Sequence, residues 1–224
     1  MRPVLKTLLN NTLRARAIRA CGGSLPDYYF DFVNNRALIA GRDIGPISNT
    51  PSLTGTLDLT PRGHLLDGVD NCLIIPLTGV VYPLTFLAEF VRNTDTGGNE
   101  IIARLDDGDA TDFVQHIINA SDQARFSVTA TTTQAQINST ATITLGQVYR
   151  TAARCNTNSA QMALGGVLST EDTVVTLPAN PTRLVVGMDS AGANANFVGY
   201  IRELAIVSNI TSTDGQLVAA ALAA

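Results

Sequence analysis

Short runs of alternating apolar and polar residues, separated by turn-forming residues, fill the sequence between residues 25 and 210. Residues 126–131 and 140–145 alternate in this way, whereas residues 73–75 and 184–186 are apolar throughout. Because successive side chains of a β-strand point to opposite faces, the alternating runs predict strands with one buried face. The apolar runs predict central strands, and no long amphipathic helix is predicted here. The pattern therefore predicts an all-β sandwich or barrel.

The end of the chain adds two details to this prediction. In the last predicted strand, residues 197–207, the expected inward residues break strict alternation at Arg202-Glu203. A β-bulge at that point restores the pattern. After the strand, Thr211-Ser212 is the expected N-cap of a short C-terminal helix that includes residues 217–222.

The N-terminal segment differs from the rest of the chain. Residues 3–20 predict a helix, because leucines recur at helical spacing and Gly22-Gly23 follows as a stop signal. The net charge of −4 divides into +5 for this segment and −9 for the remainder. An isolated helix of this length is marginal in water, so it must pack on its own domain, on other copies or on another protein. We expect residues 1–24 to be a helical anchor and residues 25–224 to be one β-sandwich domain. The expected docking residues are Arg2, Leu5, Lys6, Leu8, Leu9, Leu13, Arg14, Arg16 and Arg19.

Composition argues against several classes of protein. With 45% hydrophobic residues and a small net charge, the chain is not a disordered protein. Three cysteines in 224 residues do not make a disulfide framework. No apolar run approaches the roughly 18 residues of a membrane helix, so membrane insertion is not expected. The basic segment has no interleaved aromatic residues, so we expect no specific nucleic-acid partner.

No catalytic motif is apparent. None of the four glutamates has an acid two residues away, the spacing that places two carboxylates on one face of a strand. The two histidines, His64 and His116, lie in no recognised nucleophile motif. We therefore predict a protein that is not an enzyme. A hydrolase becomes an option only if two carboxylates face each other in a cleft.

Three parts of the sequence resemble a known fold. Residues 197–206 place an aromatic residue, a glycine two positions on, an isoleucine, an acid and alternating aliphatic residues before a short helix. This order resembles the closing strand of concanavalin A-like, laminin-G-like jelly rolls. Residues 65–76 resemble the early strand pair of that family, and residues 184–187 resemble the strand before the closing one. The resemblance implies a jelly-roll β-sandwich of two antiparallel sheets, with the short N-terminal and C-terminal helices added. The mid-domain Asn-Gly hairpin of the family is present only as Leu164-Gly165-Gly166.

The opening of the domain carries a second resemblance. In residues 30–42 a short Asp-Phe strand leads into a Gly-Arg turn, as in laminin-G-like domains of tailed-bacteriophage structural proteins. This resemblance implies a virion component made in the host cytoplasm: a capsid decoration, a head fibre or a tail fibre with a structural or adhesion role. The implied partners are other virion proteins, bound through the N-terminal segment, further copies of the chain in a homo-oligomer, for which we expect a trimer, and a host surface glycan. The alternative is a stand-alone carbohydrate-binding module or lectin.

One loop is dense in acids and is the candidate metal site. Calcium takes six to eight oxygen ligands, and clustered carboxylates supply such ligands. The spacing does not match an EF-hand loop, and a polar hairpin turn is the simpler interpretation. We expect no cofactor, with calcium as the alternative. The candidate calcium ligands are Asp106, Asp107, Asp109 and Asp112.

Two polar loops are the candidate glycan sites. Lectin sites of this fold fix sugar hydroxyls with Asp and Asn and stack an aromatic ring on the sugar. Neither loop contains an aromatic residue, so ordinary surface loops are the simpler interpretation. The candidate glycan ligands are Asn156, Asn158, Asn194 and Asn196.

Overall fold

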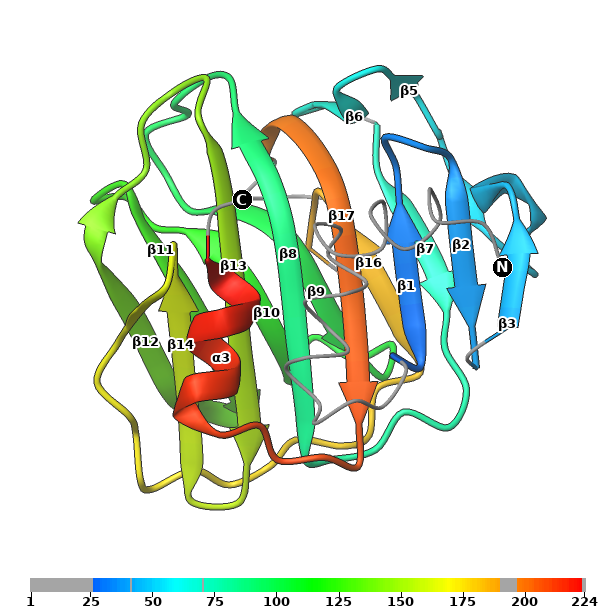
Figure 1. The fold of residues 1–224 in the computed structure, drawn as a ribbon. Helices are drawn as coiled ribbons and strands as arrows, with labels where there is room; N and C mark the ends of the chain where they lie inside the picture. The colour runs from blue at the N-terminus through cyan, green and yellow to red at the C-terminus, as the bar shows by residue number, and fades with distance from the viewer. Residues whose placement is uncertain (1–25, 41, 70, 190–196, 223–224) are drawn as a thin grey trace, which may run out of the picture.

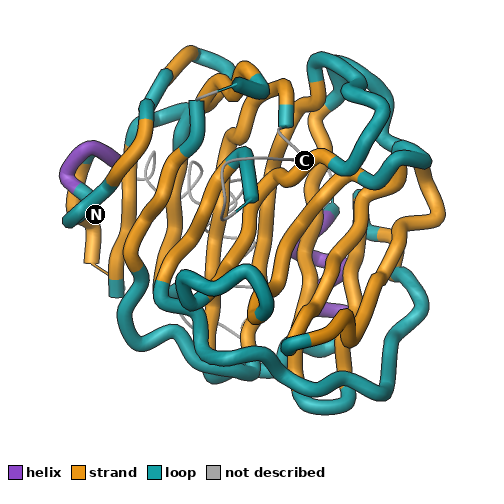
Figure 2. The backbone as a smooth tube through the Cα atoms, turned by 180° about the vertical axis from the view of Figure 1, so that it is seen from behind, coloured by secondary structure: helices purple, strands orange, loops and turns teal. Residues whose placement is uncertain are grey.

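The structure is a computed structural model, and it describes residues 26–40, 42–69, 71–189 and 197–222. Over these residues the chain folds as two antiparallel β-sheets that pack face to face (Figures 1 and 2). One sheet has ten strands and the other has seven. This arrangement confirms the predicted all-β jelly-roll sandwich. The predicted N-terminal helix and all of its docking residues lie outside the described residues.

The ten-stranded sheet has the order β15-β14-β13-β8-β17-β1-β2-β3, and β6 pairs with both β17 and β5. All of these pairings for which a register is given are antiparallel. Its strands are β1 (Tyr28–Asp31), β2 (Arg36–Ile39), β3 (Arg42–Gly45), β5 (Leu59–Thr60), β6 (Gly63–Asp67), β8 (Leu84–Arg92), β13 (Val148–Asn156), β14 (Ser159–Leu164), β15 (Val167–Leu168) and β17 (Val198–Ser208).

The seven-stranded sheet has the order β12-β11-β10-β9-β16-β7-β4 and is also antiparallel. A short 3-10 helix, η1 (Ile47–Asn49), lies between β3 and β4 in the chain. The strands of this sheet are β4 (Thr54–Gly55), β7 (Leu73–Pro76), β9 (Glu100–Asp106), β10 (Asp112–Ile118), β11 (Gln123–Ala130), β12 (Thr132–Thr142) and β16 (Arg183–Val186).

The main hydrophobic core lies between the two sheets. It takes Leu204 and Ile206 from β17 and Phe126 and Val128 from β11, and each of these side chains is buried. In β11 these residues alternate with Ser127 and Thr129, whose side chains point to the other face of the strand. Fully burying such a side chain contributes about 1.5–3 kcal/mol, so this layer holds the sandwich together.

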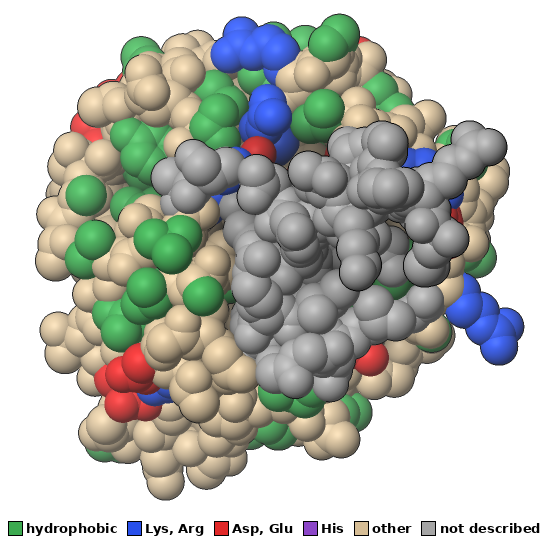
Figure 3. Space-filling view, viewed as in Figure 1, with side chains coloured by type: hydrophobic (Ala, Val, Ile, Leu, Met, Phe, Trp, Pro, Cys, Tyr) green, Lys and Arg blue, Asp and Glu red, His purple; other side chains and the backbone are tan. Residues whose placement is uncertain are grey.

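A second hydrophobic cluster lies on the opposite face of the ten-stranded sheet. Helix α3 (Asp214–Ala221) packs there against β13, β14 and β15 and buries Leu217, Ala220 and Ala221 (Figure 1). Leu87 of β8 belongs to this cluster, whereas its neighbour Phe86 belongs to the main core. Because both of its faces are covered, β8 is buried at every residue. Figure 3 shows the face that carries α3, where few charged side chains are visible outside the grey area.

Two predictions about the end of the chain have different outcomes. The register of β17 against β8 shifts between Ile201 and Glu203, which confirms the predicted bulge. The C-terminal helix is also confirmed, but its N-cap is Thr213 instead of Thr211-Ser212. The Thr213 side chain accepts a hydrogen bond from the Gln216 backbone, and the Gln216 side chain accepts one from the Thr213 backbone. This reciprocal capping box fixes the first turn at Asp214.

Two predicted strands differ from expectation. The alternating run 140–145 is not a strand throughout, because β12 ends at Thr142 and Leu145 is 50% exposed. A register irregularity between β11 and β12 near this end explains why the inward pattern stops. The strands of residues 65–76 are present as β6 and β7, but they lie in different sheets, so the chain crosses the sandwich between them.

No helix of the described residues is long and apolar enough to span a membrane.

Candidate functional site

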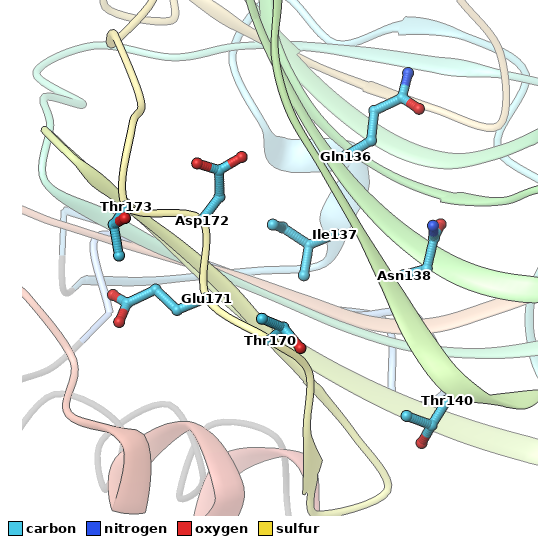
Figure 4. A pocket seen from close by; sticks show the side chains of 8 residues that line it. All are labelled: Gln136, Ile137, Asn138, Thr140, Thr170, Glu171, Asp172 and Thr173. Atoms are coloured by element: carbon cyan, nitrogen blue, oxygen red, sulfur yellow. The ribbon is translucent and has the colours of Figure 1, made fainter.

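A polar groove of about 500 Å³ lies at the side of the sandwich where β12 approaches β14 (Figure 4). Strand β12 forms one wall, and the segment of residues 170–173, which follows β15, forms the other. Figure 4 shows Ile137 pointing from β12 toward the opposite segment, with Thr170 facing it. The lining residues are Gln136, Ile137, Asn138, Thr140, Thr170, Glu171, Asp172 and Thr173.

The β12 wall follows from the alternation of this edge strand. Ile137 is buried, whereas its neighbours Gln136 and Asn138 are exposed. The Asn138 side-chain oxygen, Oδ1, accepts hydrogen bonds from the Asn119 side-chain amide at 3.1 Å and from Arg125 Nε at 2.8 Å. These two bonds fix the orientation of the Asn138 side chain at the mouth of the groove.

The opposite wall is fixed along β14 by backbone hydrogen bonds. The N–H and C=O groups of Asp172 exchange hydrogen bonds with those of Ala160, both at 2.9 Å. Three residues earlier in the chain, the backbone N–H of Ser169 donates to the Met162 carbonyl at 2.8 Å. The segment therefore follows the edge of the ten-stranded sheet instead of forming a free loop.

Arg154 connects this wall to the rest of the domain. Its guanidinium donates to Glu171 at 2.9 Å, to Asp214 at 2.7 Å and to the Ser212 carbonyl at 3.0 Å. Its Nε also donates to the Ser159 hydroxyl at 3.2 Å. One buried side chain thus ties the groove wall, the β13–β14 hairpin and the start of α3 together.

Two carboxylates lie in the groove, which is the condition for considering a hydrolase. They belong to consecutive residues, Glu171 and Asp172, and Figure 4 shows them pointing in different directions. Hydrogen bonds from Ser159 and Arg154 hold the pKa of Glu171 below its usual range. A glycosidase acid needs the opposite shift, because it must carry a proton near neutral pH. The environment of Glu171 suits an ionised hydrogen-bond acceptor.

The candidate calcium ligands are held by other parts of the chain. Asp106 is buried and forms ion pairs with Arg104 at 2.8 Å and with Arg183. Asp109 accepts from the Thr111 backbone and hydroxyl, which lowers the pKa of its carboxyl. Within the described part of the chain, which includes all four candidates, no group of three acidic, His or Cys side chains is placed to hold a metal ion. The geometry thus adds no support to calcium at Asp106, Asp107, Asp109 and Asp112, which stays a prediction.

The two candidate glycan ligands that the structure describes do not line the groove. Asn156 and Asn158 lie at the β13–β14 turn, where the Asn158 backbone has a positive φ of 56° and donates to the Val175 carbonyl at 2.9 Å. The Asn156 side-chain oxygen, Oδ1, accepts a hydrogen bond from the Thr157 backbone N–H at 2.8 Å. Both asparagines therefore have a role in the turn. Asn194 and Asn196 lie outside the described residues.

Both histidines and one cysteine are structural. His116 is buried between Phe86 and Phe126, its Nε2 donates to the Phe86 carbonyl at 3.0 Å, and burial lowers its pKa to about 4. His64 lies next to Phe32, and burial lowers its pKa. Burial raises the pKa of the Cys155 thiol to about 12, as expected for a cysteine that acts as a small hydrophobic residue.

Sequence reasoning missed the groove itself. Glu171 was considered only as a possible catalytic acid, and Gln136, Asn138 and Asp172 were not considered. A local signal is present for one wall only, because residues 169–173 are all polar, whereas residues 132–142 contain Ala and Ile. That signal does not say that the two segments meet.

Comparison with known proteins agrees with this fold. A family model described as the concanavalin A-like lectin/glucanases superfamily matches residues 70–214. The chain therefore belongs to that superfamily. No curated protein sequence matches it.

Several solved structures share the architecture at low sequence identity. Domain 4 of AbnA, a GH43 extracellular arabinanase from Geobacillus stearothermophilus in complex with arabinotriose, has a TM-score of 0.64 and 16% identity over 88% of this chain and 98% of that one. The CBM40 of the Ruminococcus gnavus IT-sialidase, bound to α2,3-sialyllactose, has a TM-score of 0.53 and 11% identity over 64% and 84%. The Trypanosoma rangeli sialidase has a TM-score of 0.60 and 12% identity, and the match covers 86% of this chain but 32% of the sialidase. These likenesses establish the fold.

Proposed function

We propose that this protein is a non-enzymatic carbohydrate-binding jelly roll whose binding site is the groove between β12 and residues 170–173. The observation that carries the proposal is the lining, which combines hydroxyl, amide and carboxylate groups around one buried aliphatic side chain. Such groups can hydrogen-bond the hydroxyls of a sugar at several points. The fold relatives that were solved with arabinotriose and with sialyllactose support the same class of ligand.

The proposal is tested by titrating the isotope-labelled full chain with a panel of oligosaccharides and following backbone resonances by NMR. We expect shifts confined to residues 136–140 and 170–173. Gln136→Ala should weaken binding by about 2- to 10-fold, because one neutral hydrogen bond contributes about 0.5–1.5 kcal/mol. Gln147→Ala makes the same chemical change at an exposed residue outside the groove and should have no effect. Binding that leaves both groove walls unshifted contradicts the proposed site.

A second proposal concerns where this module is carried. The phage-like opening of the domain and the basic N-terminal segment support a structural or adhesion component of a tailed-phage virion, with other virion proteins and copies of the chain as partners. Deleting residues 1–22 should then abolish association with particles while the circular dichroism spectrum of the sandwich is retained. A stand-alone lectin predicts no particle association in either form. In both cases glycan binding should survive the deletion.

A further inference from the structure

We infer that the groove selects uncharged, hydroxyl-rich oligosaccharides over acidic ones, an inference that rests on the proposed carbohydrate-binding function. Among the described residues that line the groove there is no lysine, arginine or histidine, whereas there are two carboxylates. A sialic or uronic acid would bring a third carboxylate into this space without a cationic partner in the lining. The charge of the lining is therefore the first selective element.

The guanidinium that pairs with Glu171 of the groove wall already has other partners. Arg154 is 9% exposed and is paired with Glu171 and Asp214, so its positive charge is compensated twice. It also donates to Ser159 and to the Ser212 carbonyl, so four of its five N–H groups have partners within the protein. Releasing Arg154 toward an acidic ligand would cost several of these bonds. It is a positioning residue for the groove wall and is not placed to receive a ligand carboxylate.

A second arginine lies beside the groove without lining it. The Nε–H of Arg125, on β11, donates a hydrogen bond to the side-chain oxygen of Asn138 at 2.8 Å and so orients the Asn138 amide. Counting Arg125 and Arg154 against the carboxylates of Glu171, Asp172 and Asp214 still leaves a net negative charge around the groove. The field at the mouth therefore disfavours an approaching anion, and this effect weakens as salt is added.

The hydrogen-bonding capacity of the lining points the same way. The carboxylates of Glu171 and Asp172 are acceptors only, while the amides of Gln136 and Asn138 and the threonine hydroxyls can both donate and accept. A neutral sugar supplies hydroxyl donors that match these acceptors. A ligand carboxylate supplies only further acceptors, so it offers no additional donor to the protein carboxylates.

The test uses a matched pair of neutral and acidic probes on the full chain. Lactose and 3′-sialyllactose differ by one acidic sugar, and arabinotriose provides a second neutral probe. Dissociation constants are measured by NMR titration at low and high salt. We expect the acidic probe to bind the groove about tenfold or more weakly than the better neutral probe. We expect high salt to reduce this difference in affinity between the acidic and the neutral probe, which we call the affinity gap.

Asp172→Asn tests the role of charge directly. This variant keeps the acceptor that holds the Val174 backbone N–H at 2.9 Å but removes one negative charge, so it should narrow the gap between the probes. Asp107→Asn makes the same change outside the groove and should leave the gap unchanged. Equal or tighter binding of 3′-sialyllactose at residues 136–140 and 170–173 would overturn the inference while sustaining the proposed function. Absence of binding by all three probes would overturn both.

Discussion

Two arginine-centred clusters in this protein use the same chemistry at different depths. Arg92 and its partner Glu100 are 2% and 0% exposed, and Arg92 also pairs with Asp95 and Asp122, each at 2.6 Å. Arg154 is 9% exposed, but its partners Glu171 and Asp214 are 34% and 59% exposed. In the first cluster, the ion pair between Arg92 and Glu100 is enclosed by the protein. The second leaves a partly solvated carboxylate at the wall of the groove.

The difference in burial distinguishes an ion pair that only stabilises the fold from one that also shapes the groove. Burial alone would lower the pKa of Arg92, but hydrogen bonds to Glu100 and Asp122 raise this pKa above its ordinary value. The buried positive charge is therefore stabilised by its carboxylate partners. Around Arg154 the partners keep contact with water, and water can replace a lost bond. Removing the central arginine should therefore have a large effect in one cluster and a small one in the other.

The largest effect is expected for Arg92→Met. The substitution leaves Glu100 as a buried carboxylate without its ion-pair partner, which destabilises proteins by about 3–5 kcal/mol. The free energy of unfolding can be measured by urea denaturation followed by circular dichroism. The double variant Arg92→Met/Glu100→Leu removes both buried charges, and Asp95 and Asp122 can turn to water, so it should recover more than half of the loss. A loss below about 1 kcal/mol in the single variant would show that water already reaches Glu100.

His116 extends the comparison to a buried group without a charged partner, and this group stays neutral. Its pKa is about 4 in the folded chain against 6.5 ordinarily, so the unfolded chain binds this proton more readily. The free energy of unfolding should therefore fall as the pH is lowered from 6.5 to 4, by about 3 kcal/mol over the full interval. Urea denaturation at a series of pH values measures this slope.

Variants assign the slope to individual histidines. His116→Gln keeps an amide donor for the Phe86 carbonyl and should remove most of the pH dependence. The slope that remains belongs in part to His64, whose pKa burial also lowers, and should decrease further in the double variant. A slope that is unchanged in His116→Gln would show that His116 is not the group that titrates.

The sequence predicted the sandwich because burial alternates locally along each strand. The inward residues Phe126 and Val128 and the bulge at Arg202-Glu203 could be predicted from neighbouring side chains alone, although Ser127, expected to be exposed, is buried. The same rule failed at residues 140–145, where a register irregularity in the pairing with β11 ends the alternation. Alternation within one strand does not show where its pairing with the neighbouring strand ends.

The groove could not be predicted in this way, because its walls are far apart in the sequence. Gln136 and Asp172 line the same groove only when the two sheets stack and β12 comes to lie beside β14. Ion-pair partners are hidden for the same reason. In the acid-dense loop, Asp106 pairs with Arg183, which lies far along the chain on the neighbouring strand. Charge in a sequence shows which groups need partners and does not show which partners they find.

A smaller effect than that of Arg92→Met is expected for Arg154→Met. Glu171 and Asp214 regain water when the guanidinium is removed, so the loss of stability should be about 1–2 kcal/mol. The loss should be concentrated in the groove wall and the start of α3, and amide hydrogen exchange at residues 170–173 measures it. A destabilisation as large as that of Arg92→Met would contradict the distinction between the two clusters.

The smallest effect concerns the protonation of Glu171. Its pKa lies below the ordinary 4.5 in the folded chain, so its contribution is complete above that pH and is lost as the pH falls through the lower folded value. Because the side chain is 34% exposed, we expect less than about 1 kcal/mol of stability to be involved. The resonances of residues 170–173 should nevertheless shift together below pH 4.5, as protonation removes the charge that binds Arg154. Glu171→Gln should abolish that transition, whereas Asp109→Asn, which removes another carboxyl with a lowered pKa, should retain it. If the groove titrates in the same way in Glu171→Gln, the ion pair with Arg154 does not hold this wall.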